Sequence, residues 1–196
     1  LPMDHGLDLN PKLFHRTSQA ALHMGITAEF LAQTQGISRA DQDNFALFSH
    51  QKAAKAQQQG AFKSEMISLT GSDEEGNLIL VDHDQCVRSD TSIDALAALA
   101  PAFMPKGGTI TAGNSSPLND GAAAMLVMSA EKANQLELTP LVQVRATAVA
   151  GVEPSVMGTG PVPATTKALR RAGLELKDMD LIELNEAFAA QALACI

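Results

Sequence analysis

The sequence feature that most constrains the fold is an abrupt change of pattern near the end of the chain. Residues 180–184 (Asp-Leu-Ile-Glu-Leu) have the character of a short strand, and residues 187–194, mostly alanine, favour a helix. Asn185 lies between them, where a helix N-cap is expected. In open α/β sheets ligands bind at this kind of junction, outside the carboxyl end of a strand, and free N–H groups there can receive an oxyanion. Asn185 is therefore either a helix cap or part of a ligand site, and the spacing leaves both interpretations open.

The first hundred residues are rich in helix signals. Ser38, with Asp41 three positions later, predicts a capped helix that Gly60 ends. Residues 66–69 and 78–81 predict two short strands on either side of a polar loop. We therefore expect a mainly helical part with a small two-stranded element.

Beyond Pro101 the pattern changes, because strand-like and helical runs alternate. The strand-like runs are residues 109–112, 123–128, 141–150 and 181–184. The helical runs fall near residues 131–135 and 164–172, and Pro161 and Pro163 suit the start of the second one. Such alternation predicts an α/β fold.

Composition and charge exclude several classes of protein. The formal net charge of -8 argues against nonspecific binding to nucleic acid, and an anionic ligand would need local positive charge. A run of about 18 apolar residues, the signal of a transmembrane segment, does not occur. Two cysteines are too few for a secreted disulfide framework, so we expect a cytoplasmic protein.

Two stretches contain residue types that bind metals or dinucleotides elsewhere, but their patterns are incomplete. Residues 82–86 (Asp-His-Asp-Gln-Cys) offer metal-ligand types, yet strand-like alternation would divide them between two faces, so we expect no metal. Residues 158–160 (Gly-Thr-Gly) begin like a dinucleotide fingerprint. Pro163 stands where that fingerprint requires glycine, so a dinucleotide site is excluded.

Four segments resemble motifs of the thiolase family, in the order and at the approximate spacing that the family uses. They are residues 22–25 (Leu-His-Met-Gly), 113–124 (Gly-Asn-Ser-Ser-Pro-Leu-Asn-Asp-Gly-Ala-Ala-Ala), 156–164 (Val-Met-Gly-Thr-Gly-Pro-Val-Pro-Ala) and 185–191 (Asn-Glu-Ala-Phe-Ala-Ala-Gln). Residues 2–6 (Pro-Met-Asp-His-Gly) and the general run of the first half are most similar to the 3-ketoacyl-CoA thiolase subunits of bacterial fatty-acid oxidation complexes. The resemblance implies a layered αβαβα core, built from two βαβαβ-type halves, with a mainly helical inserted loop domain.

The same resemblance implies a division of the chain. Residues 1–106 would form the coenzyme A-binding loop domain inserted in the N-terminal half, residues 107–137 the closing elements of that half, and residues 138–196 the start of the C-terminal half. Thiolases use an early nucleophilic cysteine, a histidine in a Gly-His-Pro motif and a second cysteine in a Cys-x-Gly motif. Neither Cys86 nor Cys195 lies in such a motif, and Gly-His-Pro does not occur. We therefore expect the central part of a thiolase, incomplete at both ends and inactive alone.

The resemblance also implies roles for single residues. Asn185 would hold the water that, with the absent histidine, stabilises the substrate oxyanion. The residues that would bind coenzyme A or border the acyl group are His23, Met24, Arg88, Phe103, Ser116, Met157 and Phe188. Without the resemblance, periodicity favours Met157 as core filler, and Arg88 is at least equally a solvated surface residue. Pro117 removes a backbone donor beside Ser116, which puts that part of the family's pattern in question.

The implied activity is that of a 3-ketoacyl-CoA thiolase, which transfers an acyl group to coenzyme A with release of acetyl-CoA in fatty-acid β-oxidation. Coenzyme A would be a co-substrate, with no permanently bound cofactor. We expect a homodimer, within a complex that includes a hydratase/dehydrogenase subunit. Two alternatives stay open: an acetoacetyl-CoA thiolase, since acyl-chain length is not readable here, and a noncatalytic module for coenzyme A binding or dimerisation.

Overall fold

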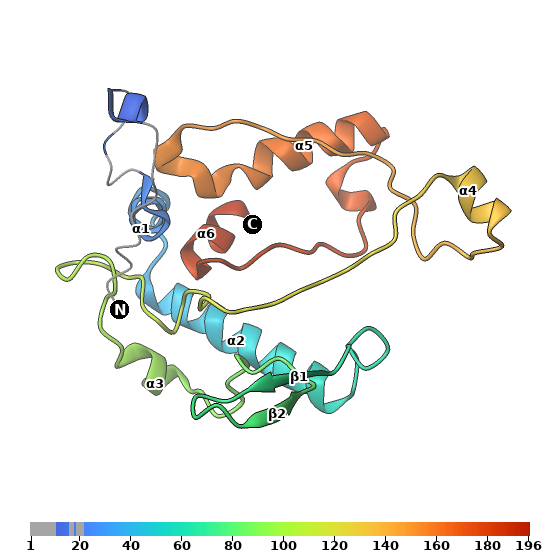
Figure 1. Ribbon diagram of the computed structural model, residues 1–196. Coiled ribbons are helices and arrows are strands. Elements are labelled where there is room, and N and C mark those ends of the chain that lie inside the picture. Colours follow the sequence, from blue (N-terminus) through green and yellow to red (C-terminus); the bar gives the residue numbers. More distant parts are fainter. Residues whose placement is uncertain (1–10, 16–17, 19–21) are drawn as a thin grey trace.

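The computed structural model describes residues 11–15, 18 and 22–196, so residues 2–6 lie outside the described residues. Its helices and strands are, in chain order, η1 (Pro11–His15), α1 (Met24–Gln35), α2 (Arg39–Gln58), β1 (Leu69–Ser72), β2 (Leu78–Val81), α3 (Ile93–Ala97), α4 (Ala130–Gln135), η3 (Pro154–Thr159), α5 (Pro161–Ala172), η4 (Leu176–Asp178) and α6 (Ala189–Cys195). Figure 1 shows α1, α2 and α6 close together, with α5 above α6 and the β1–β2 hairpin beside the far end of α2.

The start of α2 follows the capping pattern of the sequence. The Ser38 hydroxyl accepts the Asp41 backbone N–H at 3.1 Å, and the Asp41 carboxylate accepts the Ser38 backbone N–H at 3.0 Å. This reciprocal pair satisfies two N–H groups that would otherwise lack partners at a helix start. Gly60, with a φ of 69°, lies just beyond the end of α2. The predicted helix is therefore confirmed at both ends.

The two predicted short strands form a hairpin, but its first strand lies three residues later than expected. β1 and β2 are antiparallel, with Leu69 opposite Val81 and Ser72 opposite Leu78. The turn between them is fixed by Asp73, whose carboxylate accepts the backbone N–H groups of Glu75 and Asn77. β2 begins directly after this turn. The strand that pairs with it, β1, must therefore end directly before the turn, at Ser72.

Small residues allow the helices of the core to approach closely. Ala28 and Ala32 on α1 and Ala190 on α6 are buried in one cluster with Ile110 and Phe188. Gly158 in η3 belongs to the same packing, because a Cβ at that position would stand 2.6 Å from the Gln191 side chain. These contacts bring α1, η3 and α6 together around the junction that precedes α6.

A buried carboxylate joins α1 to the segment after residue 108. Glu29 is 1% exposed, and it accepts the backbone N–H groups of Thr109 and Ile110 and the Thr109 hydroxyl at 2.9–3.1 Å. Buried charges are tolerated when several donors surround them in this way. The contact holds residues 109–111 against α1.

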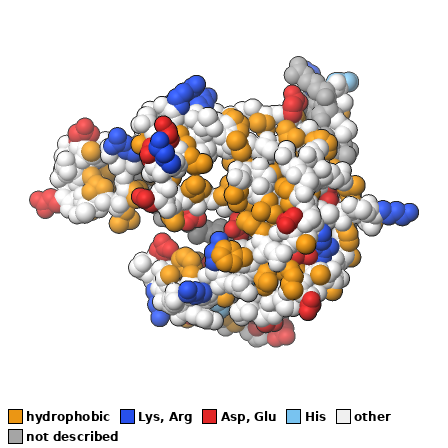
Figure 2. All heavy atoms as spheres, turned by 180° about the vertical axis from the view of Figure 1, so that it is seen from behind, with side chains coloured by type: hydrophobic (Ala, Val, Ile, Leu, Met, Phe, Trp, Pro, Cys, Tyr) orange, Lys and Arg blue, Asp and Glu red, His pale blue; other side chains and the backbone are white. Residues whose placement is uncertain are grey.

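The strand predictions beyond Pro101 are wrong for the structure of the described residues. Residues 123–128, 141–150 and 181–184 belong to no strand, and residues 109–112 form a single isolated bridge, between Thr111 and Pro101. The apolar side chains of residues 123–128, 141–150 and 181–184 are largely exposed, with Leu141 at 98%, whereas Ile110 is buried. Figure 2 shows apolar side chains spread over the surface. An apolar pattern favours a strand, but a strand forms only when a neighbouring backbone supplies hydrogen bonds.

The helical predictions of the same region agree better with the structure. α4 begins one residue earlier than predicted, and α5 begins at Pro161, where proline is favoured because the first helical N–H lacks a partner. α5 also anchors the extended segment before η3, since Lys167 and Arg171 donate to the carbonyl oxygens of Val149 and Thr147.

Candidate functional site

The junction before α6 is not the helix cap that the pattern allowed. α6 begins at Ala189 with Phe188 in the N-cap position, so the interpretation of Asn185 as the cap is wrong. The reason is a backbone pairing that the sequence does not reveal. Ser116 N–H donates to Ala187 O and Ala189 N–H donates to Asn114 O, both at 2.9 Å, around an isolated bridge between Ser115 and Phe188. This pairing holds Phe188 in an extended conformation, so the helix begins only at Ala189.

Neighbouring side chains of the junction line different cavities. Asn185 lines a cavity of about 210 Å³. Glu186, the next residue, lines a cavity of about 860 Å³. The two adjacent side chains therefore leave the backbone toward different cavities. The junction therefore forms part of the wall between the two spaces.

The smaller cavity brings four of the predicted site residues together. Met24, Met157, Asn185 and Phe188 line it, together with apolar atoms of α1 and α6. Asn185 is exposed, and its side chain makes no hydrogen bond to another described residue. Such a cavity, mostly apolar with a free amide, suits an acyl chain that carries a polar carbonyl end.

Phe103 supports this cavity from behind and does not line it. Its ring meets the Phe188 ring edge to face, with the centroids 5.9 Å apart and the planes at 76°. The same ring covers Gly25, where a Cβ would stand 2.3 Å from it. Gly25 is therefore the residue that lets Phe103 reach Phe188.

His23 lies at the N-terminal end of α1 and lines neither described cavity. Its carbonyl accepts the Thr27 N–H at 3.0 Å, as the first hydrogen bond of a helix requires, and its side chain makes no capping hydrogen bond. His23 is therefore not among the residues that line the cavity of Asn185 and Met157, although its neighbour Met24 is.

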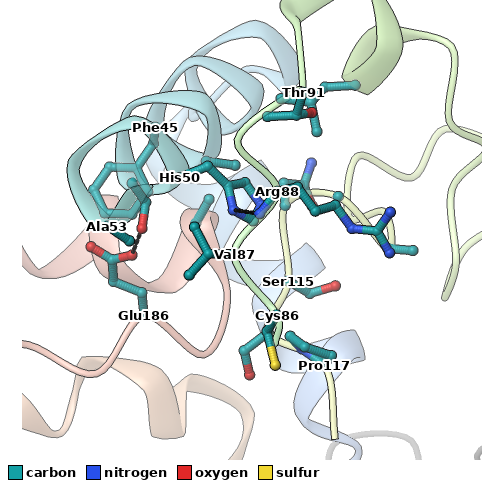
Figure 3. A pocket seen from close by; sticks show the side chains of 18 of the residues that line it. Phe45, His50, Ala53, Cys86, Val87, Arg88, Thr91, Ser115, Pro117 and Glu186 are labelled. Carbon is teal, nitrogen blue, oxygen red and sulfur yellow. Dashed lines mark hydrogen bonds between the residues drawn. The ribbon is translucent and has the colours of Figure 1, made fainter. Parts of the chain in front are cut away.

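The larger cavity contains Arg88 and Ser116. It is lined by α2, α3, the loop of residues 85–91 and residues 112–119. The Arg88 side chain is exposed, makes no ion pair with a described residue, and extends away from Glu186 (Figure 3). A free guanidinium beside a cavity can attract a phosphate or carboxylate group.

Two contacts of α2 in this cavity were not predicted. The His50 Nδ1 accepts the Arg88 backbone N–H at 3.2 Å, and the Ser49 hydroxyl donates to Glu186 Oε2 at 2.5 Å (Figure 3). Burial and the nearby Arg88 cation lower the pKa of His50, while the Glu186 carboxylate acts in the opposite direction. His50 is consequently neutral near pH 7, which leaves its Nδ1 free to accept.

A buried polar network fixes the loop before Ser116. Asn114, 2% exposed, accepts the Thr111 N–H at 2.8 Å and donates to the Asp43 carboxylate at 3.0 Å. Arg39 binds the same carboxylate at 2.7 Å. Asn114 belongs to the motif of residues 113–124, but the sequence does not identify it as part of a network. Asp43 and Arg39 lie in no motif, and the contacts of Asp43 with Asn114 and with Arg39 depend on the fold.

Metal-ligand types do not gather in the described part of the chain. Groups of three or more histidine, cysteine or acidic residues that could hold a metal ion do not occur there. Within the same residues, every helix is too short or too polar to cross a membrane.

Comparisons with known proteins agree along the whole chain. Residues 10–131 match the family described as thiolase, N-terminal domain, and residues 138–196 match thiolase, C-terminal domain. The 3-ketoacyl-CoA thiolase of Marinomonas sp. (strain MWYL1) is 56% identical over 97% of this chain and 49% of its own length. That of Aliivibrio fischeri (strain ATCC 700601 / ES114) is 57% identical over 100% of this chain and 51% of its own length.

A solved structure gives the same result for the fold. The Bacillus anthracis acetyl-CoA acetyltransferase is similar with a TM-score of 0.83 and 44% identity, over 88% of this chain and 43% of that protein. The chain spans about half the length of the curated relatives it matches.

Proposed function

The chain belongs to the thiolase family, and we propose that it serves a 3-ketoacyl-CoA thiolase, an acyltransferase that moves a shortened acyl group to coenzyme A and releases acetyl-CoA. The observation that carries this proposal is the junction at Asn185, where a free amide faces a mostly apolar cavity between α1, η3 and α6. Identities of 56% and 57% to proteins named 3-ketoacyl-CoA thiolase support the choice of substrate class.

Asn185 acts in this proposal as a holder of the oxyanion. Its amide binds a water molecule that donates to the carbonyl oxygen of the substrate as negative charge develops there. Preorganised donors of this kind lower the barrier of acyl transfer by several kcal/mol. The nucleophilic cysteine, the Gly-His-Pro histidine and the Cys-x-Gly cysteine do not occur in these 196 residues, so we expect the 196 residues alone to be inactive.

Coenzyme A occupies the region of the two cavities. Arg88 attracts a phosphate group, Ser116 binds an amide of the pantetheine arm, and Met24 and Met157 border the acyl group. Phe188 forms the wall of the smaller cavity and Phe103 supports it from behind. Pro117 has no N–H to offer beside Ser116. The assignment of His23 to coenzyme A binding rests on the resemblance of residues 22–25 to a thiolase motif.

The wider setting is also part of the proposal. Coenzyme A is a co-substrate that leaves after each turnover, and no metal or other cofactor takes part. The protein works in the cytoplasm, in fatty-acid β-oxidation, as a homodimer that joins a hydratase/dehydrogenase subunit. Nucleic acid is not a partner, given the net charge of -8.

An acetoacetyl-CoA thiolase is the second candidate. Two solved relatives named acetyl-CoA acetyltransferase support it, at 44% and 38% identity. Those identities are lower than the values for relatives named 3-ketoacyl-CoA thiolase, so we place it second.

Thiolysis assays separate the candidates. The complete reading frame that contains this chain is expressed, and coenzyme A-dependent cleavage of acetoacetyl-CoA and of medium-chain and long-chain 3-ketoacyl-CoA is compared. A higher kcat/KM for the longer substrates supports the proposal, and a preference for acetoacetyl-CoA supports the second candidate. Binding of coenzyme A without cleavage of any substrate would instead favour a noncatalytic module.

A further inference from the structure

The junction before α6 is held from two directions, and one of them is a side-chain contact. Backbone pairing with residues 114–116 fixes Ala187 to Ala189. On the other side, the Ser49 hydroxyl binds the Glu186 carboxylate at 2.5 Å, across 137 positions of the sequence. Asn185 itself has no side-chain hydrogen bond to another described residue. Its orientation therefore depends on how firmly its neighbours are held.

Glu186 is the neighbour that can control Asn185 directly. The two residues are adjacent in the chain and line different cavities, so a shift of the backbone that they share would move both side chains. The hydrogen bond from a hydroxyl group to a carboxylate is charge-assisted and therefore strong. Both Ser49 and Glu186 are half-buried, which limits competition from water.

We propose that Glu186 is a positioning residue for Asn185, held in place by Ser49 of α2. This inference rests on the proposed function, in which Asn185 supports the oxyanion. Ser49 belongs to the predicted coenzyme A-binding loop domain and Asn185 to the predicted C-terminal half. The contact thus aligns the helix next to the coenzyme A site with the residue that acts on the carbonyl group.

The sequence neighbour of Ser49 extends this alignment to Arg88. His50 accepts the Arg88 backbone N–H, so the loop that presents the Arg88 guanidinium is attached to the same turn of α2. Figure 3 shows His50, Arg88 and Glu186 around one cavity. One helical turn therefore holds both the residue assigned to the phosphate and the residue that positions Asn185.

Steady-state thiolysis by the complete reading frame tests this inference. Ser49→Ala and Glu186→Ala should each lower kcat about tenfold, the lower end of what a lost charge-assisted hydrogen bond can cost. The KM for coenzyme A should change less than about threefold, because neither side chain is assigned to the nucleotide. Ser49→Thr keeps a hydroxyl and Glu186→Gln keeps an acceptor oxygen, so both should retain most of kcat. Gln51→Ala, on an exposed position of α2, is the matched control.

A double-mutant cycle distinguishes positioning from a general loss of structure. In an Asn185→Ala background, Glu186→Ala should have little further effect on kcat, because it acts through Asn185. An equal tenfold loss in that background, or an unchanged kcat in the single variants, would overturn the inference while the wild-type activity leaves the proposed function intact. A wild-type protein that cleaves no 3-ketoacyl-CoA would reject the proposed function, and this inference with it.

Discussion

Substitution of Glu29 tests how much one buried carboxylate contributes to stability, because this side chain accepts hydrogen bonds from backbone N–H groups about 80 residues later in the chain. Its carboxylate accepts the backbone N–H groups of Thr109 and Ile110, and both Glu29 and Ile110 are buried. Glu29→Ala would leave these two donors without a partner. A buried donor left without a partner costs about 1–3 kcal/mol, so we expect the free energy of unfolding to fall by about 2–6 kcal/mol.

The conservative variant has a smaller expected effect. Glu29→Gln keeps a carbonyl oxygen that can accept both N–H groups. In the wild type the Thr109 hydroxyl donates to the Glu29 carboxylate, and in the variant the amide NH₂ can donate to that hydroxyl instead. We expect a loss of about 1–2 kcal/mol, mainly from the change to an uncharged acceptor.

Urea unfolding followed by circular dichroism measures these differences in free energy. Glu65→Ala, at an exposed position whose side chain has no described partner, is the control and should change stability by less than about 0.5 kcal/mol. A loss below about 1 kcal/mol for Glu29→Ala would refute the reasoning, because it would mean that water satisfies the two backbone donors in the folded protein.

Three further predictions concern the site. Asn185→Ala should lower the kcat of thiolysis about a hundredfold with little change in the KM for coenzyme A, as measured by steady-state kinetics, and an unchanged kcat would contradict its assigned role. The pKa of His50 is lowered in the folded protein, so the unfolded chain binds the proton more readily and stability should fall as the pH drops below about 6.5. Thermal unfolding at pH 5 and pH 7.5 should show a larger difference for the wild type than for His50→Gln, and equal differences would argue against this reasoning. Gly25→Ala should destabilise the protein by about 1–3 kcal/mol, because the new Cβ would stand 2.3 Å from Phe103, and a Tm equal to that of the wild type would show that the ring can move aside.

Local features of the fold could be predicted from the sequence. The capping pair of Ser38 and Asp41 and the proline at position 161 act within one helical turn, and both helix starts are confirmed. The membership of the thiolase family and the α/β thiolase fold are also confirmed, by matches along the chain and by a solved relative with a TM-score of 0.83. The domain boundaries near residues 106 and 137 stay predictions.

Non-local pairings could not be predicted in the same way. The apolar pattern of residues 141–150 is that of a strand, but hydrogen bonds to a neighbouring backbone decide whether a strand forms. The pattern allowed Asn185 to be a helix cap, but the bonds from Ser116 and Ala189 to distant carbonyl groups place the N-cap at Phe188. Long-range contacts of this kind leave no periodic trace in the sequence.

The residues of the candidate site fall into the same two groups, those that a local motif predicts and those that only long-range contacts reveal. Asn185, Met24 and Met157 lie in motifs, and the structure brings them to one cavity, although their roles stay predictions. Ser49 and His50 carry no such signal, because their partners lie 137 and 38 positions away. Glu186 lies beside Asn185 in its motif, and its proposed positioning role rests on a contact with α2 that the sequence does not reveal.

The backbone pairing between residues 114–116 and 187–189 also bears on the order in which the protein matures. The ribosome releases the first of these segments well before the second, so the N–H of Ser116 and the carbonyl of Asn114 must wait for their partners. Both partners of the contact between Glu29 and residues 109–110 lie in the first 110 residues, so it can begin to form while synthesis continues, although Phe188 and Ala190 complete the core around Ile110 later. Closing the loop between residues 116 and 187 carries its own entropic cost. In nascent chains halted before residue 187, hydrogen exchange should therefore be slower at residues 109–110 than at Ser116, whose partner has not yet been made.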